Sequence, residues 1–407
     1  MSAPCTPYAQ VMHRQQIDLA EAIDILKETL PRPASETLPL TQAAGRVLSA
    51  SLSAKVDHPS VDDSAMDGIA CRLEDSQSTP VTLKLIGESR AGEGFSGGVG
   101  AGECVRIYTG APVPAGANAI CKVEDLQIEG DQVTLLHPAR SQDIRHRGSD
   151  FQVGQEGLQK GDVLSPARLA LAASMGYSEV PVYRKLRVGI LSTGDEVIEA
   201  GQPLQPGQVY DSNRYGIYAL LLEMGLEPVL LPHATDHIDE VKKNLQNADL
   251  DVLLTSGGVS MGNYDIVRDL LFGEGEVKFW KINLRPGGPA LCGLWQGIPV
   301  LGLPGNPVSA LVVFEVLFKP AIFALLGRTD APHRKVRARA LNAFKAVPRK
   351  TAYWRAQLNA QNGELVVQDL NAPLSNMLRG LAHANALVVV EPGQAVEAGG
   401  LAEVIWL

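Results

Sequence analysis

The sequence predicts a multidomain protein of α/β plus β structure, in which one domain is built on a central parallel sheet. Three observations support this fold class. First, the chain has 407 residues, which is too long for one ordinary hydrophobic core. Second, apolar strands alternate with helical segments over residues 187–330, as in parallel βαβ units. Third, residues 54–149 and 331–407 contain short β-type runs separated by turns.

Local patterns refine this outline. Asp18 and Glu21 resemble a capping box, and apolar residues at helical spacing predict a helix from there to Leu30. A second helical pattern covers residues 167–175, and we expect the two helices to pack together in one domain made of two separated segments. The pair Asn362-Gly363, between two β-type runs, predicts a hairpin within a separate C-terminal β domain.

The composition restricts the possible classes of function. A formal net charge of −9 argues against a protein that coats nucleic acid, because such binding needs an excess of Lys and Arg. The five cysteines form no C-x-x-C pair, so we expect neither a zinc site nor a disulfide framework, and a reducing compartment fits best. No signal peptide and no uninterrupted apolar run of membrane-spanning length is recognised. We therefore expect a cytoplasmic protein with no nucleic-acid and no membrane partner.

Three of the expected strands each lead into a loop of small polar residues. The loops are Ser192-Thr193-Gly194-Asp195-Glu196, Ser256-Gly257-Gly258-Val259-Ser260 and Pro304-Gly305-Asn306-Pro307. In a parallel sheet these loops share the carboxyl edge, where doubly wound folds bind ligands. Glycine lets backbone N–H groups approach a ligand, a helix N-terminus favours anions, and Pro307 suits a first helical position. The loops therefore predict a site for anionic, phosphate-bearing ligands.

Two further glycine motifs match the signatures of other functions. The stretch Gly92-x-Gly94-x-x-Gly97 matches a dinucleotide fingerprint but leads into more glycines rather than a helix, so we interpret it as a turn. The stretch Gly258-Val259-Ser260-Met261-Gly262 matches the nucleophile elbow of a serine hydrolase, with Ser260 as the nucleophile. That alternative stays open, although neither His333 nor His383 follows a recognisable strand.

Seven motifs follow one another along nearly the whole chain. They are Asp63–Gly68 (DSAMDG), Arg106–Pro114 (RIYTGAPVP), Arg147–Asp150 (RGSD), Ser192–Glu196 (STGDE), Tyr210–Asn213 (YDSN), Ser256–Ser260 (SGGVS) and Leu303–Ser309 (LPGNPVS). Together they resemble the molybdopterin molybdenumtransferase family, the bacterial counterpart of the gephyrin E domain. Seven motifs in order are far more specific than any one of them.

The resemblance implies a fold, an assembly and an activity. It implies four domains: an elongated domain I (1–53 and 150–186), a β-rich domain II (54–149), a three-layer α/β, molybdopterin-binding domain III (187–330) and a β-barrel-like domain IV (331–407). Two subunits would form a homodimer, with the active site between domain III of one and domain II of the other. This transferase would use Mg²⁺ to insert molybdate into adenylated molybdopterin, releasing AMP and forming the molybdenum cofactor. A molybdopterin adenylyltransferase and molybdoenzymes or carrier proteins would be transient partners.

The resemblance also implies roles for residues, by motif position. Catalytic roles fall on Asp67, Thr109, Asp150, Glu196, Lys281 and Arg285, and the family's substrate-binding positions fall on Pro304, Pro307, Arg355 and Ser375. The chemistry of the three loops adds further candidates for substrate binding: Ser192, Thr193, Gly194, Ser256, Gly257, Gly258, Ser260, Gly305 and Asn306. Asp236 and Asp265, together with Glu196, would bind Mg²⁺ or the water around it. Charge supports this assignment, because converging carboxylates repel an anionic substrate unless a divalent cation lies between them. Lys281 and Arg285 suit oxyanion or phosphate charge.

The chain departs from the family pattern in places, and two other functions stay open. Gly288 replaces a usual Lys in Pro286-Gly287-Gly288-Pro289, and Arg379-Gly380 replaces a usual Ser-Ser. The related molybdopterin adenylyltransferase shares two of the three loops, but not the β-rich segment with Asp67 and Thr109 or the C-terminal domain. A scaffold is the other hypothesis, since the gephyrin E domain also binds a receptor segment. The retained acids and Lys281 favour chemistry.

Overall fold

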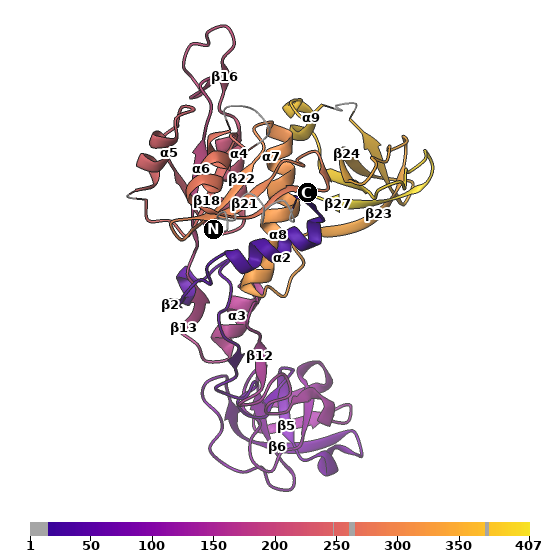
Figure 1. Ribbon diagram of the computed structural model, residues 1–407. Coiled ribbons are helices and arrows are strands. Elements are labelled where there is room, and N and C mark those ends of the chain that lie inside the picture. The colour runs from indigo at the N-terminus through magenta and orange to yellow at the C-terminus, as the bar shows by residue number, and fades with distance from the viewer. Residues whose placement is uncertain (1–14, 247, 260–264, 371–373) are drawn as a thin grey trace, which may run out of the picture.

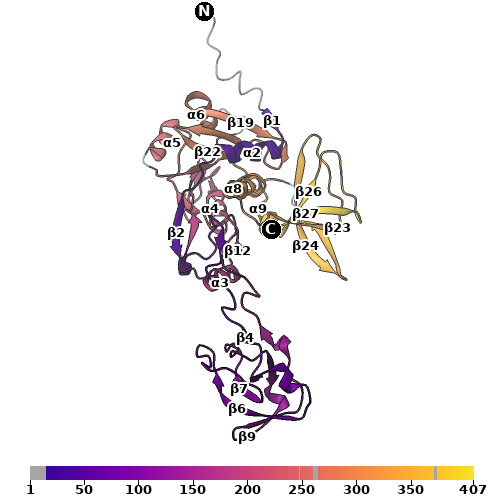
Figure 2. The ribbon, with the colours of Figure 1, turned by 90° about the horizontal axis from the view of Figure 1, so that it is seen from below.

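The computed structural model describes residues 15–246, 248–259, 265–370 and 374–407. The molecule is elongated (Figures 1 and 2). The α/β domain and the C-terminal β domain lie side by side, and the β-rich domain lies at the far end, beyond a region of short paired strands. The motifs of the β-rich domain are therefore distant from those of the α/β domain within one chain.

The α/β domain is built on a seven-stranded sheet in the order β1-β19-β21-β22-β18-β14-β17. Its strands are β1 (Gln15–Ile17), β14 (Arg187–Ser192), β17 (Glu227–Leu230), β18 (Val252–Ser256), β19 (Glu276–Ile282), β21 (Leu291–Trp295) and β22 (Ile298–Leu303). Strands β14, β17, β18 and β22 are parallel, whereas β21 is antiparallel to β19 and β22. The three predicted strands are confirmed and adjacent. The sequence pattern does not predict β1, which pairs in parallel with β19.

Helices cover both faces of this sheet and make it the middle layer of three. Leu254 packs in one core and its neighbour Leu253 in another, because successive side chains of a strand point to opposite faces. The first core includes helices α4 (Asn213–Glu223), α7 (Pro307–Val313) and α8 (Lys319–Leu326), and the second includes α5 (Ile238–Leu245) and α6 (Ile266–Glu274). A short parallel pair, β15 (Val197–Ile198) and β16 (Val209–Tyr210), forms an arm beyond the sheet (Figure 1).

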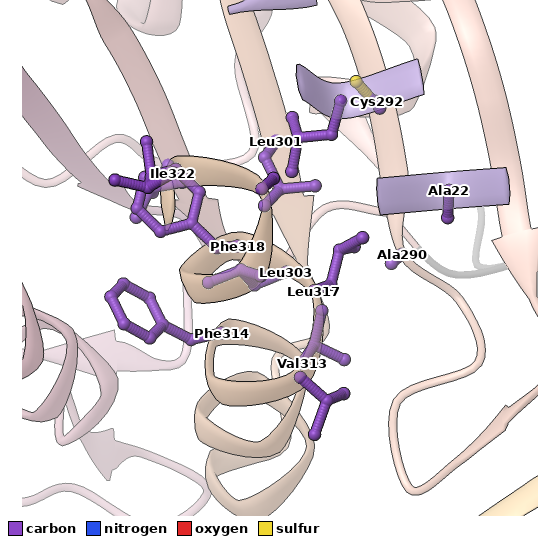
Figure 3. Close-up of a cluster of buried hydrophobic side chains, with 14 of the residues drawn as sticks. Ala22, Ala290, Cys292, Leu301, Leu303, Val313, Phe314, Leu317, Phe318 and Ile322 are labelled. Atoms are coloured by element: carbon purple, nitrogen blue, oxygen red, sulfur yellow. The ribbon is translucent and has the colours of Figure 1, made fainter. Parts of the chain in front are cut away.

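The helical run from α7 to α8 forms the centre of the first core. A π-helical turn (Phe314–Phe318) joins the two helices. Figure 3 shows Leu317 and Phe318 of this run in one cluster with Leu301 and Leu303 of β22. Residues 307–326 are long and apolar enough to cross a membrane by length and composition, but 72% of the helix window is buried inside the protein. These apolar side chains therefore serve as core.

The separated N-terminal segments pair through short strands. Strand β2 (Ser35–Pro39) pairs with β13 (Glu179–Tyr183), and β3 (Leu52–Ser53) pairs with β12 (Glu156–Leu158). The predicted second helix is α3 (Pro166–Ser174). Its N-cap residue is Ser165, whose hydroxyl accepts a hydrogen bond from the Arg168 N–H. Helix α3 packs in this local core.

The first predicted helix is α2 (Leu19–Thr29), and it ends before Pro31 as expected. The prediction that it packs on α3 is wrong, because Ala22 and Leu26 belong to the α/β core, against α8 and β19. The predicted capping box is also wrong. The Asp18 side chain makes no cap, and its carboxylate accepts a hydrogen bond from the Asn283 side-chain amide at 3.0 Å.

The β-rich domain contains a six-stranded sheet in the order β8-β5-β7-β6-β10-β9. Its strands are β5 (Gly68–Cys71), β6 (Val81–Ser89), β7 (Glu103–Ile107), β8 (Ala119–Lys122), β9 (Leu126–Glu129) and β10 (Gln132–Leu135). A separate ladder joins β4 (Asp63–Ser64) to β11 (Ile144–Arg145). The motif at residues 92–97 lies between β6 and β7 and leads into no helix, which confirms its interpretation as a turn.

The C-terminal domain is a closed barrel. Its strands pair in the order β24-β25-β23-β27-β26, and β26 pairs back onto β24. They are β23 (Arg334–Ala340), β24 (Thr351–Gln361), β25 (Glu364–Asp369), β26 (Ala386–Val390) and β27 (Leu401–Trp406), with α9 (Leu378–Ala382) beside them. Strand β20 (Leu284–Arg285) joins β24 in parallel. Asn362 and Gly363 have φ angles of 50° and 81°, as a two-residue hairpin turn requires, which confirms the predicted turn.

Replacement of Leu26 by Ala tests whether α2 is a structural part of the α/β core. Leu26 is 1% exposed, and removal of a buried leucine side chain costs about 2–5 kcal/mol. We therefore expect Leu26→Ala to lower the midpoint of guanidinium unfolding, followed by the fluorescence of the four tryptophans, of which Trp280 and Trp295 lie in the α/β domain. Glu28→Ala, at an exposed position of α2, should leave the midpoint unchanged. Equal midpoints for both variants would contradict the assignment of α2 to this core.

Candidate active site

The carboxyl ends of four strands lie in one row at an edge of the central sheet. Leu191 of β14 pairs with Thr255 of β18, which pairs with Gly302 of β22. Through β21 the same row reaches Trp280 of β19. Since β19 points in the same direction as β22, the next residue, Lys281, reaches the same edge. The sheet thus brings Lys281 and the starts of the three predicted loops together.

Backbone hydrogen bonds hold these loops against one another. The Thr193 N–H donates to the Ser256 carbonyl at 3.2 Å, and the Gly257 N–H donates to the Leu303 carbonyl at 3.1 Å. Gly257 and Gly258 adopt φ angles of 97° and 66°. A β carbon on Gly257 would lie 3.0 Å from the Thr193 carbonyl oxygen, and one on Gly258 would lie 3.1 Å from Thr193 Oγ1. Both the backbone conformation and the close approach therefore require glycine.

Asn213 connects two of the loops through its side chain. Its Nδ2 donates to Ser256 Oγ at 2.6 Å and to the Gly305 carbonyl oxygen at 2.7 Å. Asn213 is 7% exposed, so water has little access to these hydrogen bonds. Asn213 is not among the site residues predicted from the sequence. Its place at the end of the Tyr210–Asn213 motif is the signal that could have found it.

Several buried polar atoms at this edge have no hydrogen-bond partner within the described part of the chain. They are Ser192 Oγ, Thr193 Oγ1, Thr255 Oγ1 and Asn213 Oδ1. An unpaired buried polar group costs roughly 1–3 kcal/mol, so such groups are normally paired. Because hydroxyl groups both donate and accept, this set fits a polar ligand at the loops.

The loop after β22 opens the helical run of residues 307–326. Pro307 stands at the first helical position, as predicted, and Asn306 precedes it as the N-cap residue. The Val308 N–H donates to the Ser375 carbonyl oxygen at 3.2 Å, which attaches a segment of the barrel domain to this helix start. The loop therefore connects the sheet edge to the barrel.

Four carboxylates gather beside the loops. Burial, and then the nearby charges of Asp195, Glu196 and Asp265, raise the pKa of Asp236. The Asp236 N–H donates to Asp195 Oδ1 at 3.0 Å, which ties the loop after β17 to the loop after β14. Asp236, Asp195, Glu196 and Asp265 therefore lie in one region, here called the acidic cluster, in which Asp265 Oδ2 also accepts a hydrogen bond from Arg268 Nη1 at 3.4 Å. Among the described residues, however, no three such side chains lie close enough together to hold a metal ion directly.

A cavity of ≈ 320 Å³ lies between the α/β domain and the barrel, and it is cationic. Arginines but no carboxylates occur among its described lining residues: Arg285, Pro286, Gly287, Pro289, Pro304, Asn306, Ser309, Ala352, Tyr353, Trp354, Arg355, Leu374 and Ser375. Burial lowers the pKa of Arg355, whose Nη1 donates to the carbonyl oxygens of Leu374 (3.2 Å) and Met377 (3.1 Å). The cavity brings together five of the predicted site residues: Arg285, Pro304, Asn306, Arg355 and Ser375.

Lys281 lies at the sheet edge with its ammonium over an indole ring. Its Nζ is 4.2 Å from the centroid of the Trp280 ring. Trp280 Nε1 donates to the Val259 carbonyl oxygen at 3.2 Å, so the indole links the end of β19 to the loop after β18. The cation–π contact and this hydrogen bond hold the lysine beside the loops.

Asp67 directly precedes β5, Thr109 follows β7 and Asp150 lies between β11 and β12. The β-rich domain that contains β5 and β7 is far from the α/β domain of the same chain (Figures 1 and 2). Asp67 Oδ1 accepts hydrogen bonds from the Thr109 N–H at 2.7 Å and from Thr109 Oγ1 at 2.8 Å. These two hydrogen bonds, the backbone one first, lower the pKa of Asp67. Asp150 is exposed, and its N–H donates to the His58 carbonyl oxygen at 3.0 Å. Within one chain, the predicted site residues therefore lie in two separate places.

The hydrolase hypothesis depends on residues that the structure places elsewhere or leaves outside its description. Ser260 lies outside the described residues. His333 Nε2 is 2.8 Å from the carbonyl oxygen of Glu315, in the middle of the core helix, and His383 follows α9. Neither histidine follows a strand of the central sheet.

Comparisons with known proteins identify the family. Residues 17–176 match the MoeA N-terminal region (domain I and II), residues 189–324 match a probable molybdopterin binding domain, and residues 337–407 match the MoeA C-terminal region (domain IV). A molybdopterin molybdenumtransferase from Haemophilus influenzae is 37% identical over 383 residues, covering 92% of this chain and 94% of that protein. The chain belongs to the molybdopterin molybdenumtransferase family.

Further members of this transferase family support the assignment. Molybdopterin molybdenumtransferase 2 from Mycobacterium tuberculosis is 38% identical over 385 residues, covering 91% of this chain and 94% of that protein. The crystal structure of the molybdopterin biosynthesis MoeA protein from Pyrococcus horikoshii matches with a TM-score of 0.83 and 26% identity, covering 97% of this chain and all of that one (100%). The predicted fold class is therefore confirmed.

Replacement of Asn213 by Ala tests whether this side chain fixes the loops. The change removes both donors and leaves the Gly305 carbonyl and the Ser256 hydroxyl without them, at a cost of roughly 1–3 kcal/mol. We expect amide hydrogen exchange to accelerate about tenfold in peptides that contain Gly257 or Gly305. Asn118→Ala serves as control, because it removes a similar contact, with the Leu73 N–H, in the β-rich domain. Unchanged exchange at both loops would contradict the role assigned to Asn213.

Proposed function

We propose that this protein is a molybdopterin molybdenumtransferase that inserts molybdate into adenylated molybdopterin, releases AMP and forms the molybdenum cofactor. The observation that carries the proposal is the row of strand ends, which holds polar loops between an acidic cluster and a cationic cavity. An anionic substrate with two phosphates and a second, oxyanionic substrate need this combination. The names of the relatives support the same function.

The binding residues divide by position. The loops after β14 and β18 would bind the phosphates of adenylated molybdopterin through Ser192, Thr193, Gly194, Ser256, Gly257, Gly258 and Ser260. The cavity would hold molybdate through Arg285, Arg355, Ser375 and the loop Pro304, Gly305, Asn306 and Pro307. An Arg fork grips two oxygens at once, whereas the Lys281 ammonium acts as a point charge between the two regions.

The acidic cluster fits Mg²⁺, which keeps several waters and binds through one or two carboxylates together with substrate phosphates. Asp236 and Asp265, with Glu196, would hold the ion or its water. When bound, Mg²⁺ would neutralise phosphate charge and polarise the linkage that is cleaved. The raised pKa of Asp236 supports this fit, because it reflects the carboxylates that surround the group.

The chemistry would depend on positioning rather than on a covalent enzyme intermediate. The loop amides and hydroxyl groups would orient the adenylate linkage. Lys281 and Arg285 would hold the oxyanion beside the dithiolene sulfurs that receive the molybdenum. Water would attack the adenylate linkage and displace AMP, and the two dithiolene sulfurs would displace oxygens of molybdate, which leave as water with the thiol protons.

A homodimer would complete the site. Asp67 and Thr109 are fixed to each other by two hydrogen bonds, yet they are distant from the loops of their own chain. In the proposed dimer, the β-rich domain of one subunit would present Asp67, Thr109 and Asp150 to the sheet edge of the other. We further propose a cytoplasmic location, with a molybdopterin adenylyltransferase and recipient molybdoenzymes or carriers as transient partners.

The central test is an assay with purified protein and adenylated molybdopterin. We expect AMP release and cofactor formation only when both molybdate and Mg²⁺ are present. Asp236→Asn should raise the Mg²⁺ concentration for half-maximal activity about tenfold, because one carboxylate ligand is lost. An adenylyltransferase would instead accumulate adenylate from molybdopterin and MgATP, and a scaffold would show neither reaction. Either of these outcomes would contradict the proposal.

Mixing two inactive variants tests the shared site. Asp67→Ala damages the β-rich domain and Glu196→Ala damages the sheet edge, so neither homodimer should form cofactor. After subunit exchange, half of the dimers are mixed and each mixed dimer has one intact site, so about a quarter of the wild-type activity should return. A mixture that stays inactive although mixed dimers are detected by native mass spectrometry would show that each site belongs to one chain.

A further inference from the structure

Lys350 is fixed beside the wall of the cationic cavity by strand pairing. It directly precedes β24, whose first residue, Thr351, pairs with Leu284 of β20. The Thr351 N–H also donates to the Asn283 carbonyl oxygen at 3.1 Å. Lys350 of the barrel therefore lies beside the turn of the α/β domain that leads from β19 to β21.

The Lys350 ammonium stands close to Gly288, in space that a side chain at this position would need. A β carbon on Gly288 would lie 3.5 Å from Lys350 Nζ, and 3.3 Å and 3.4 Å from the carbonyl oxygens of Leu284 and Ile282. Since Gly288 has no side chain, the ammonium can approach the backbone of the turn. The residues on both sides of Gly288, Gly287 and Pro289, line the cavity.

The Lys350 ammonium is not paired with an acid among the described residues. The carboxylate of Glu391 is bound by the next residue instead, since its Oε2 accepts a hydrogen bond from Thr351 Oγ1 at 2.9 Å. Lys350 is only half exposed, and its ammonium forms no ion pair with any carboxylate among the described residues. The cavity beside it already contains Arg285 and Arg355 and, among its described lining residues, no acid. Three cations in one region repel one another unless an anion lies between them.

From this arrangement we infer that Lys350 is a third cationic binding residue of the cavity and helps Arg285 and Arg355 hold a tetrahedral oxyanion. The inference rests on the proposed function, in which the cavity receives molybdate. None of the sequence motifs contains Lys350, and it comes from the barrel rather than from the loops of the sheet. The barrel then contributes charge from two positions, Lys350 at the start of β24 and Arg355 within it.

The test is molybdate binding to the full-length protein, measured by equilibrium dialysis at low and at high ionic strength. Lys350→Met keeps the length of the side chain and removes the charge. We expect its Kd for molybdate to be about three- to tenfold higher at low salt, with a weaker salt dependence than wild type. Lys350→Arg should keep the affinity, and Lys335→Met, which removes an exposed charge from β23 of the same barrel, should change nothing.

A second variant separates charge from structure. In Lys350→Met combined with Gly288→Lys, an ammonium returns to the same gap from the opposite side, and we expect part of the lost affinity and salt dependence to return. Wild-type affinity in Lys350→Met, or a loss of affinity with unchanged salt dependence, would overturn the inference while the cavity still binds molybdate. Absence of molybdate binding by the wild-type protein would instead overturn the proposed function of the cavity.

Discussion

The common register of β14, β18 and β22 is the constraint on which the site depends. A shift of β18 by one residue would turn every one of its side chains to the other face of the sheet. It would also break the hydrogen bonds from Thr193 to Ser256 and from Gly257 to Leu303. The glycines of this loop have no side chains with which to compensate. The geometry of the loops is therefore a property of the sheet as a whole, and both apolar cores support it.

The remaining domains differ in how closely they contact this sheet edge. The barrel is held by the β20–β24 pairing and by the Val308–Ser375 hydrogen bond, so the cavity between the two domains has walls from both. Helix α2 is also part of the α/β core, although it begins the chain. The β-rich domain lies at the far end of the molecule (Figure 1). This contrast is the reason for the proposal that a second subunit supplies Asp67 and Thr109.

The features that the sequence predicts are those with a local signal. Apolar runs followed by small polar residues predict the three strands and loops, and Asn362-Gly363 predicts its hairpin, because each pattern is contained within a few residues. The features that the sequence does not predict depend on contacts between residues far apart in the chain. Helix α2 has an amphipathic pattern that does not tell which core it faces. Asn213, Asp195 and Lys350 reach the groups beside them only when strands far apart in the chain lie side by side.

Charge is distributed unevenly along the row of strand ends, and this gives the site a direction. Carboxylates come from the loops after β14 and β17 and from Asp265 at the start of α6. Most cations come from β19, β20 and the barrel, on the opposite side of β18 and β22, whereas Arg268 of α6 donates to Asp265 at 3.4 Å within the acidic cluster. A phosphate with a bound divalent cation is favoured at the first end and a bare oxyanion at the second. Because reversing the two ligands would place more like charges together at both ends, we expect the charges along the edge to favour one orientation of the proposed substrates.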